Sequence, residues 1–422
     1  MGCVSFIGHG WHVESGIPEM SLARALYSVL TWAAQPLLLR KLRRRAVAEP
    51  GYGRAVGERF GRYARPIDSL MPQSSTDPLH SFVWIHAVSL GETRAAAILL
   101  AELRQQLPGM RLLLTHGTAT GRAEGEKLLL PGDVQVWQPW DTRGAVRRFL
   151  RQFRPAYGGL TAVWAQTDAD AERLLRMGAP VQGVFGNLKF DVVPDAAQLA
   201  RGRAWRARSA RPVVMLASSR EGEEAMWLDV FKQNWHPALS QQAPAAINSE
   251  ANQGASPVQW LVVPRHPQRF AEVQQLLRSA GLTVSSRSQW ADAPEPADVW
   301  LGDSLGEMVL YYGLADVALL GGSFAPLGGQ NLIEAIACGC PVVLGPHTFN
   351  FAEAAALACE QGVAHRVPDI GQGVQQACEL ATNAPRLAAA RGLTQDFTLQ
   401  HRGAARLTAT AIRALLGIPA TP

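Results

Sequence analysis

A strand, a glycine-rich turn and a helix follow one another late in the chain, and this order constrains the fold most. The apolar run Val317–Leu320 predicts a buried strand, and the helical run Asn331–Cys338 follows the turn Gly321–Gln330. Glycine permits positive φ angles and a close approach of the backbone to a ligand. A helix start offers unpaired N–H groups and the positive end of a dipole. The pattern predicts a phosphate site, or only a plain strand-to-helix turn.

Glu334 lies in the first turn of the expected helix. A carboxylate beside a phosphate repels it, so we expect Glu334 to bind a neutral diol such as a ribose. A phosphate site beside a ribose site implies a nucleotide. The alternative is that Glu334 only stabilises the start of the helix through the helix dipole.

Strands, turns and helices alternate along most of the chain, which predicts parallel sheets and an α/β fold. The expected strands lie at 82–88, 111–115, 134–137, just before Gln166, and at 213–217, 260–263, 282–285, 299–301, 317–320 and 341–345. The expected helices include 92–106, one from Arg122, 143–152, 168–177, one from Glu221, and several near the C-terminus.

The chain is too long for one ordinary core and suits two domains. Basic, polar residues 201–211 predict a linker, and residues 240–259 predict a disordered surface insertion. Two doubly wound, Rossmann-like sheets place the carboxyl ends of their strands across a cleft. The expected boundaries are 66–205 for the first domain, 206–400 for the second, and 401–422 for a C-terminal helix and tail.

Charge and cysteine usage exclude several classes of protein. The formal net charge is +5, but residues 1–65 hold ten Lys/Arg and four Asp/Glu, so they carry +6 and the rest about −1. This local excess argues against nucleic-acid binding. Five cysteines form no CxxC pair and predict free thiols in a reducing compartment. No metal-ligand cluster is visible in the sequence, and we expect no metal and no cofactor.

The basic excess follows an apolar run. Ala25–Leu39 precedes the basic stretch Arg40–Arg45. The run is shorter than the ~20 apolar residues of a spanning helix and lacks a signal-peptide cleavage site. An interfacial helix with a polybasic end suits an anionic cytoplasmic leaflet, so residues 21–65 predict membrane association. The alternative is a helix packed on the protein itself. Residues 1–20 are expected to be an unstructured or artefactual extension.

Glu92 follows the first predicted strand and opens a helix. The helix dipole favours its ionised form. An ionised carboxylate at the carboxyl end of a strand suits a general base. The alternative is a glutamate that only complements the dipole. His86 lies within the strand and is expected to be packed rather than catalytic.

Two cations and two turns lie where ligands are expected. Arg265 follows a strand, and its planar donor fork suits phosphate. Lys189 is placed to neutralise charge on a leaving group. The alternative for each is a solvated cation or a structural ion pair. The turn 302–307 is a weak candidate for contact with a base or phosphate. The turn 115–121 is a candidate for contact with an acceptor.

Together these segments resemble the 3-deoxy-D-manno-octulosonic acid (Kdo) transferases of lipopolysaccharide assembly. The matching blocks, in the family's order, are ERFG at 58–61, HAVSLGE at 86–92, THGTATG at 115–121, GNLKFD at 186–191, SSREGEE at 218–224, PRHP at 264–267, DSLGEM at 303–308, GGS…GGQNLIEA at 321–335 and GPHTFNF at 345–351. The ordered set is specific, and the resemblance covers most of residues 21–400.

The resemblance implies a GT-B fold and inverting transfer of Kdo from CMP-Kdo to a lipid A precursor (lipid IVA), without a metal. It implies an enzyme at the cytoplasmic face of the inner membrane, with Glu92 as catalytic base and Lys189 stabilising the transition state. The implied donor-binding residues are Pro264, Arg265, Leu305, Gly306, Glu307, Asn331, Leu332, Ile333 and Glu334, to which the glycine-rich turn adds Gly322 and Ser323.

The chain departs from the family after Pro155. There the family carries a block with a Glu-bearing TELWPN motif, and about one to one and a half βα units, ~50 residues, are absent here. The loss removes a second acidic residue assigned to catalysis and a strand of the first sheet. Gln330 replaces a usual His, and Ser219-Arg220 replace a usual Thr-His. The alternatives are an impaired CMP-binding homologue or scaffold, and a GT-B transferase for another nucleotide sugar.

Overall fold

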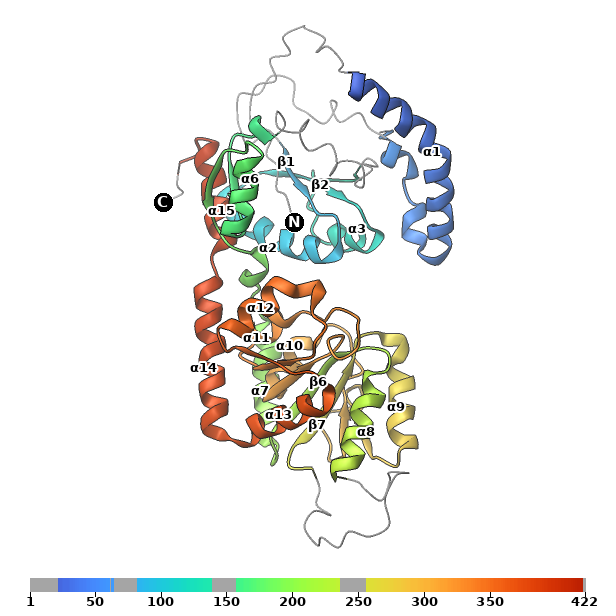
Figure 1. Ribbon diagram of the computed structural model, residues 1–422, viewed down its shortest axis with the longest axis vertical. Coiled ribbons are helices and arrows are strands. Elements are labelled where there is room, and N and C mark those ends of the chain that lie inside the picture. Colours follow the sequence, from blue (N-terminus) through green and yellow to red (C-terminus); the bar gives the residue numbers. More distant parts are fainter. Residues whose placement is uncertain (1–21, 61, 64–81, 139–156, 236–255, 420–422) are drawn as a thin grey trace, which may run out of the picture. The chain divides into compact units, whose positions relative to one another are not determined.

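The computed structural model describes residues 22–60, 62–63, 82–138, 157–235 and 256–419. The chain forms two compact units, Met1–Asp191 with Arg402–Pro422 and Val192–His401 (Figure 1). Each is built on parallel strands and helices, so the predicted α/β class is confirmed. The predicted GT-B arrangement of the two units stays a prediction. The predicted extension 1–20, the predicted helix 143–152 and residues 240–255 lie outside the described residues.

The first unit begins with a long helix. α1 spans Leu22–Ala48, and two short 3-10 helices follow it, η1 (Pro50–Gly53) and η2 (Val56–Phe60). Among the described helices, none combines the length and apolar character needed to cross a membrane. The predicted association of this segment with a membrane surface stays a prediction.

Two separate parallel sheets follow in the first unit. β1 (Phe82–His86), β2 (Arg111–His116) and β3 (Val134–Trp137) form one, in that order, and β4 (Val163–Ala165) pairs with β5 (Val181–Val184) in the other. Within the described residues, β1 has a partner strand along one edge only. Loss of a strand between β1 and β4 would produce this split.

The helices of the first unit include one from the far end of the sequence. They are α2 (Leu90–Gln106), α3 (Ala119–Glu126), α6 (Asp168–Arg176) and α15 (Ala404–Leu415), with the 3-10 helix η6 at Leu188–Asp191. Ala409 and Ile412 of α15 share one core with Leu99 of α2 and Ile85 of β1. The C-terminal helix is therefore part of the first unit.

The second unit has one seven-stranded parallel sheet in the order β12-β11-β10-β6-β7-β9-β8. Its strands are β6 (Val213–Ser219), β7 (Gln259–Pro264), β8 (Val284–Ser286), β9 (Val299–Leu301), β10 (Val317–Leu320), β11 (Val342–Leu344) and β12 (Ala364–Arg366). β6 is buried at every residue, so both faces of the sheet are covered. Chain order reverses between β6 and β10, which is where such sheets bind ligands, at the carboxyl ends of the strands.

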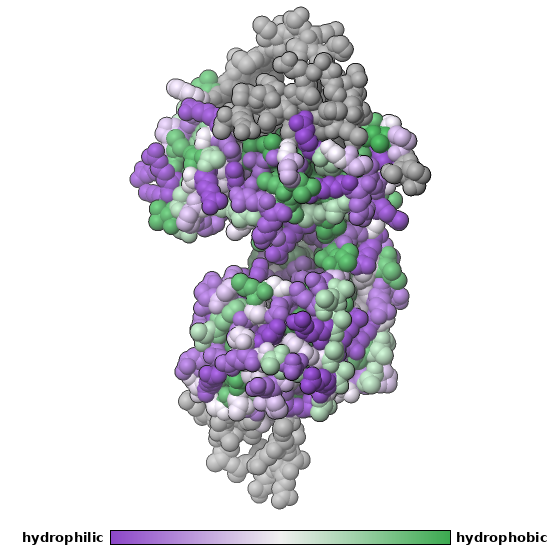
Figure 2. Space-filling view, turned by 180° about the vertical axis from the view of Figure 1, so that it is seen from behind, coloured by the Kyte–Doolittle hydropathy of each residue, from purple (hydrophilic) through white to green (hydrophobic). Residues whose placement is uncertain are grey.

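Helices surround this sheet (Figure 1). They are α7 (Ala196–Arg208), α8 (Glu223–Trp235), α9 (Phe270–Ser279), α10 (Met308–Leu314), α11 (Leu332–Ala337), α12 (Ala352–Glu360), α13 (Ile370–Thr382) and α14 (Ala384–His401), with 3-10 turns η8 (Pro267–Arg269), η9 (Arg287–Gln289) and η10 (Phe349–Phe351). Trp227, Phe231 and Trp260 anchor the core. In Figure 2, hydrophobic residues on the visible face form small groups among hydrophilic ones, as is usual for protein surfaces.

The predicted linker 201–211 is wrong, because most of it belongs to α7. Trp205 is buried there, and Arg206 pairs with the buried Asp316. Gly202 lets the helix approach α10 closely, since a Cβ there would lie 2.1 Å from the Leu310 carbonyl oxygen. The boundary between the units falls after Asp191 rather than after residue 205. The predicted insertion also ends too late, since Gln259 begins β7.

Candidate active and donor sites

Glu92 closes the loop between β1 and α2. The Ser89 Oγ accepts the Glu92 N–H at 3.4 Å, and the Glu92 Oε2 accepts the Val88 N–H at 2.7 Å. These two bonds give Glu92 a structural role at the start of α2, beyond the dipole-complementing role that the sequence left open. Among the described residues, the Glu92 Oε1 has no hydrogen-bond partner. One oxygen of this half-buried carboxylate is therefore available to a ligand.

The turn 115–121 lies against the Glu92 loop. The Val88 carbonyl accepts the Gly117 N–H at 3.1 Å and the Thr118 Oγ1–H at 3.0 Å. The same carbonyl thus joins the loop after β1 to the loop after β2. The structure brings together the predicted base and the predicted acceptor turn, as expected for two neighbouring parallel strands.

Arg59 fastens the N-terminal segment to this turn. Its Nη2 donates to the Gly117 carbonyl at 3.1 Å, and its guanidinium carbon lies 3.9 Å from the centre of the Trp137 ring. Burial lowers the pKa of Arg59 to about 10, so the group is still cationic at neutral pH. Glu58 accepts from Arg122 at 2.9 Å and from the Trp137 N–H at 2.8 Å. Sequence reasoning recognised the ERFG block but not this anchoring role.

Lys189 lies in η6, which contacts α2 within the same unit. Its N–H donates to the Asn187 Oδ1 at 3.0 Å. Asp191, two residues later, accepts the N–H groups of Gly403 and Ala405, the second at 2.6 Å, and so caps α15. The loop that carries Lys189 is therefore held between α2 and the C-terminal helix.

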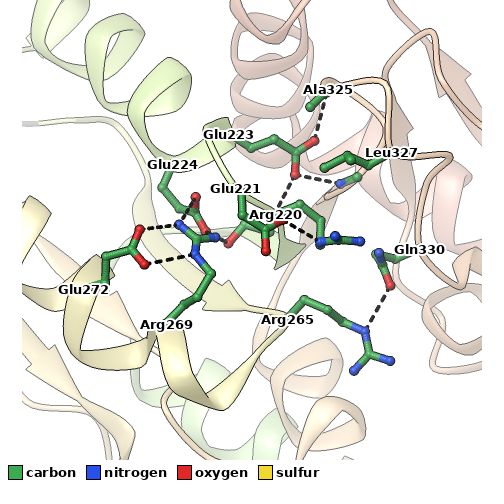
Figure 3. Close-up of polar contacts among 12 residues, drawn as sticks. Arg220, Glu221, Glu223, Glu224, Arg265, Arg269, Glu272, Ala325, Leu327 and Gln330 are labelled. Carbon is green, nitrogen blue, oxygen red and sulfur yellow. Dashed lines mark hydrogen bonds and ion pairs between the residues drawn. The ribbon is translucent and has the colours of Figure 1, made fainter. Parts of the chain in front are cut away.

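A carboxylate fills the glycine-rich turn after β10. Glu223, the first residue of α8, has no exposed surface. It accepts the N–H groups of Gly322 at 2.6 Å, Phe324 at 3.0 Å, Ala325 at 3.2 Å and Arg220 at 2.9 Å (Figure 3). The prediction that these N–H groups bind a phosphate is therefore wrong, because they already donate to the protein's own carboxylate.

The two predicted donor residues inside the turn have internal roles. Ser323 is fully buried, and its Oγ contacts the Leu320 carbonyl and accepts the Gly345 N–H at 2.8 Å. Gly322 has a φ of +71°, and a Cβ there would lie 3.1 Å from the Gln330 Nε2. The sequence signal was correct for a special backbone conformation, but the conformation serves packing around Glu223.

The helix after the turn is also capped from within. The Asn331 Oδ1 accepts the Ile333 N–H at 3.1 Å, and the side chains of Leu332 and Ile333 are buried in the core. The predicted phosphate site at this helix start therefore lacks that N–H group. Glu334 is half-buried in the same helix. Burial and the charge of Glu334 both raise the pKa of Tyr312, which places the two side chains near each other. Its contact with a ribose stays a prediction.

Arg265 follows β7 and faces the turn. Its N–H donates to the Ser219 carbonyl at 2.9 Å, and its Nε donates to the Gln330 Oε1 at 3.1 Å (Figure 3). Gln330 thus orients the arginine. Pro264, the last residue of β7, pairs with Ser219 of β6. The structure places Arg265 at the carboxyl end of its strand, as predicted.

The turn 305–307 is held by hydrogen bonds within its own unit. The Gln198 Nε2 donates to the Gly306 carbonyl at 3.0 Å, and Arg287 pairs with Glu307 at 2.8 Å. Gly306 has a φ of +77°, and Leu305 is exposed. The turn exists as predicted, and its contact with a nucleotide stays a prediction.

A buried ion pair next to the glycine-rich turn was not predicted. Arg269 donates to both oxygens of Glu224, at 2.9 and 3.1 Å, and the Ser219 hydroxyl donates to the same carboxylate at 2.7 Å. Burial alone would lower the pKa of Arg269, but Glu272 and Glu224 together raise it. The adjacent Glu223 and Glu224 of the SSREGEE block were the sequence feature that could have indicated this ion pair. In the described part of the chain, no group of three or more His, Cys, Asp or Glu residues is placed to hold a metal ion.

Comparison with known proteins shows the family to which the chain belongs. Residues 54–161 match the family described as 3-Deoxy-D-manno-octulosonic-acid transferase (kdotransferase). The chain is 39% identical to the 3-deoxy-D-manno-octulosonic acid transferase of Bordetella pertussis, over 94% of this chain and 100% of that protein. It is 27% identical to the Haemophilus influenzae transferase of the same name, over 86% of this chain and 91% of that protein. The chain therefore belongs to the 3-deoxy-D-manno-octulosonic acid transferase family.

The solved structures similar to this chain include the C-terminal CMP-Kdo binding domain of an Acinetobacter baumannii protein. It is 28% identical, with a TM-score of 0.39, and covers 48% of this chain and 100% of that domain. A Rickettsia africae glycosyltransferase is 12% identical, with a TM-score of 0.42, over 79% of this chain and 97% of that protein.

The alignment with the Bordetella relative bears on the missing block. It runs over 453 positions, whereas this chain has 422 residues, so the relative must have residues with no counterpart here. This excess agrees with a block absent from the chain. The two separate sheets of the first unit agree with it as well.

Proposed function

We propose that the protein transfers Kdo from CMP-Kdo to a lipid A precursor, lipid IVA, with inversion at the anomeric carbon. Membership of the transferase family supports the reaction class. The observation that carries the proposal for this chain is the geometry of Glu92. One carboxylate oxygen accepts the Val88 N–H, and the other has no hydrogen-bond partner among the described residues. The Val88 carbonyl joins this loop to the turn 115–121.

In the proposed reaction, the Glu92 Oε1 removes the proton from an acceptor hydroxyl. The acceptor oxygen bonds to the anomeric carbon as the bond from that carbon to the phosphate oxygen breaks, and CMP leaves with the electron pair. CMP is a stable phosphate monoester, so it needs charge neutralisation more than protonation. Lys189 and Arg265 are the cations proposed for that role. No cofactor is required.

The proposed location is the cytoplasmic face of the inner membrane, because the acceptor is a lipid. α1 supports contact with an anionic surface. It exposes the large apolar side chains of Val29, Trp32 and Leu37, and the basic stretch Arg40–Arg45 follows them. Such a helix suits the interface of a bilayer rather than its interior.

A second candidate function is a CMP-binding scaffold without transfer activity. The split sheet of the first unit favours it, because the described strands of that unit form two small sheets, whereas those of the second unit form one seven-stranded sheet. Transfer from another nucleotide sugar is the third possibility, and competition by other nucleotides, measured calorimetrically, would reveal it.

Acceptor-dependent release of CMP from CMP-Kdo tests the proposal. The wild-type protein should release CMP only when lipid IVA is present. Glu92→Gln keeps an oxygen for the Val88 N–H but cannot accept a proton, so kcat should fall about 100-fold or more. Glu102→Gln, on the same helix and away from the loop, is the matched control and should leave kcat unchanged.

A version with the family's block inserted after Pro155 separates the first two functions. Transfer by the wild-type chain supports the enzyme. Transfer only by the restored chain supports the scaffold. Equal activity of Glu92→Gln and wild type would reject Glu92 as the base.

A further inference from the structure

Three loops meet at the reversal point of the second sheet. They follow β6, β7 and β10, which are adjacent strands. The first loop carries Arg220, the second Arg265 and the third Gln330. Figure 3 shows the Arg220 and Arg265 side chains on either side of Gln330. This is the position at which open α/β sheets bind their ligands.

The backbone at this position has little capacity left for an anion. Glu223 accepts the N–H groups of Gly322, Phe324 and Ala325, and it adds a buried carboxylate. A phosphate placed on the same turn would be repelled by that carboxylate. Charge on a bound nucleotide must therefore be met by side chains.

Arg220 is suited to that role. Its side chain runs across Gly322, since a Cβ on that glycine would lie 3.5 Å from the Arg220 Cγ. Its Nε pairs with the exposed Glu221 at 2.9 Å. Among the described residues, its Nη1 and Nη2 groups have no hydrogen-bond partner. Arginine presents these groups as a planar fork that matches two phosphate oxygens.

The pKa of the neighbouring His266 reflects the arginine charges around these loops. Burial lowers the pKa of His266, and the charges of Arg220, Arg265 and Arg269 lower it further, against the opposing charge of Glu221. The three guanidinium groups therefore act on one small volume. Arg269 is paired with Glu224 and Glu272, so Arg220 and Arg265 are the cations placed to meet an anionic ligand.

We propose that Arg220 and Arg265 together bind the phosphate of the CMP group, and that Glu221 competes with the phosphate for Arg220. The proposal rests on CMP-Kdo being the donor, and it adds Arg220 to the residues expected to bind the donor. Gln330 sets the orientation of Arg265 through its hydrogen bond.

Calorimetric titration of CMP against cytidine tests the site, because the two ligands differ only in the phosphate. Arg220→Gln should weaken CMP binding about 10-fold, the usual effect of losing a charge-assisted hydrogen bond. It should leave cytidine binding, measured by displacement, unchanged. Only the Arg220 backbone N–H bonds to Glu223, so the substitution keeps the turn. Arg278→Gln, an exposed cation on α9, is the matched control and should change neither affinity.

Glu221→Gln supplies a test in the opposite direction. Removing the competing carboxylate should strengthen CMP binding a few-fold, about 2- to 5-fold for an exposed ion pair. Cytidine binding should again stay unchanged. A gain of affinity cannot come from damage to the fold.

Equal CMP affinity in Arg220→Gln and wild type would overturn the proposal, and so would an equal loss for cytidine. Failure of the wild type to bind CMP would reject the proposed donor. In that case UMP binding that still depends on Arg220 would support the phosphate site, and absence of binding by both nucleotides would reject the site as well.

Discussion

At the scale of single residues, Glu223 decides what the glycine-rich turn does. It accepts four backbone N–H groups and is fully buried. Each buried donor left without a partner costs roughly 1–3 kcal/mol, so the turn depends on this side chain. Its partners in the turn lie about one hundred residues further along the chain, and no local pattern reveals such a pairing.

His116 is a buried residue with a consequence for stability at low pH. It has no exposed surface, and its Nδ1 donates to the Ala87 carbonyl at 3.0 Å. Its Nε2 has no hydrogen-bond partner in the part of the chain that the structure describes. Burial lowers the pKa of His116 to about 4. The unfolded chain, with a pKa near 6.5, binds the proton more readily. Stability is therefore complete above about pH 6.5 and falls as the pH drops towards 4, by roughly 2–4 kcal/mol.

Urea unfolding between pH 7 and pH 4.5 measures this loss. Other groups also titrate in the range, so the comparison is with His116→Asn, whose amide can still donate to the Ala87 carbonyl but does not titrate. The wild type should lose more stability than this variant as the pH falls. Parallel pH profiles for the two proteins would show that His116 is not the cause.

At the scale of elements, η6 and α15 are joined through the Asp191 side chain. Asp191 ends η6 and caps α15, and Phe190 between Lys189 and Asp191 is buried. The apolar face of α15 packs into the core of the first unit. A helix more than two hundred residues away in sequence therefore holds the loop that carries the proposed catalytic lysine.

Asp191→Ala should affect both stability and catalysis. Loss of a helix cap typically costs about 1 kcal/mol, and displacement of Lys189 should lower kcat more than it changes KM for the donor. Asp369→Ala is a matched control, because Asp369 caps α13 through the Gln372 N–H at 2.8 Å and α13 carries none of the proposed site residues. It should lose similar stability and keep kcat. Equal kcat values in the two variants would show that Asp191 does not affect catalysis through Lys189.

At the scale of the whole molecule, the N-terminal segment joins a proposed membrane surface to the proposed active loop. The Arg45 guanidinium lies 4.1 Å from the centre of the Tyr52 ring, and that ring stacks on Trp137 at 6.1 Å. Arg59 adds the contact to Gly117, next to the Glu92 loop. Cation–π contacts of this kind contribute about 0.5–2 kcal/mol each, so they hold the end of α1 against the rest of the first unit.

Vesicle binding tests the role of α1. The wild type should bind vesicles that contain phosphatidylglycerol, with a blue shift in tryptophan emission as Trp32 enters the interface. Each basic residue near an anionic surface contributes about 1 kcal/mol, so Arg43→Gln with Arg44→Gln should weaken binding roughly 30-fold. Arg201→Gln with Arg208→Gln, two exposed arginines of α7, is the control pair. An equal effect of both pairs, or binding that does not weaken in salt, would contradict the prediction.

Sequence patterns predicted strands and helices well where apolar spacing is regular. β3, β9 and β10 were predicted with their observed ends, and β1, β2 and β6 with one end shifted by one or two residues. The pattern failed at α7, because its surface is dominated by arginines and it includes a glycine, which are typical of linkers. The contact with α10, the burial of Trp205 and the ion pair between Arg206 and Asp316 stabilise the segment as a helix, and none of them is visible in the local sequence.

By itself, the sequence determined the parallel α/β class, the order of the family's blocks and the loops that carry Glu92, Lys189 and Arg265. These features are local, since they depend on apolar periodicity and on residues close together in the chain. The tertiary structure decided which groups those loops leave open. It filled the glycine-rich turn with Glu223, capped the following helix with Asn331, and left Arg220 beside Arg265, because backbone donors pair with whichever acceptor the fold places nearest.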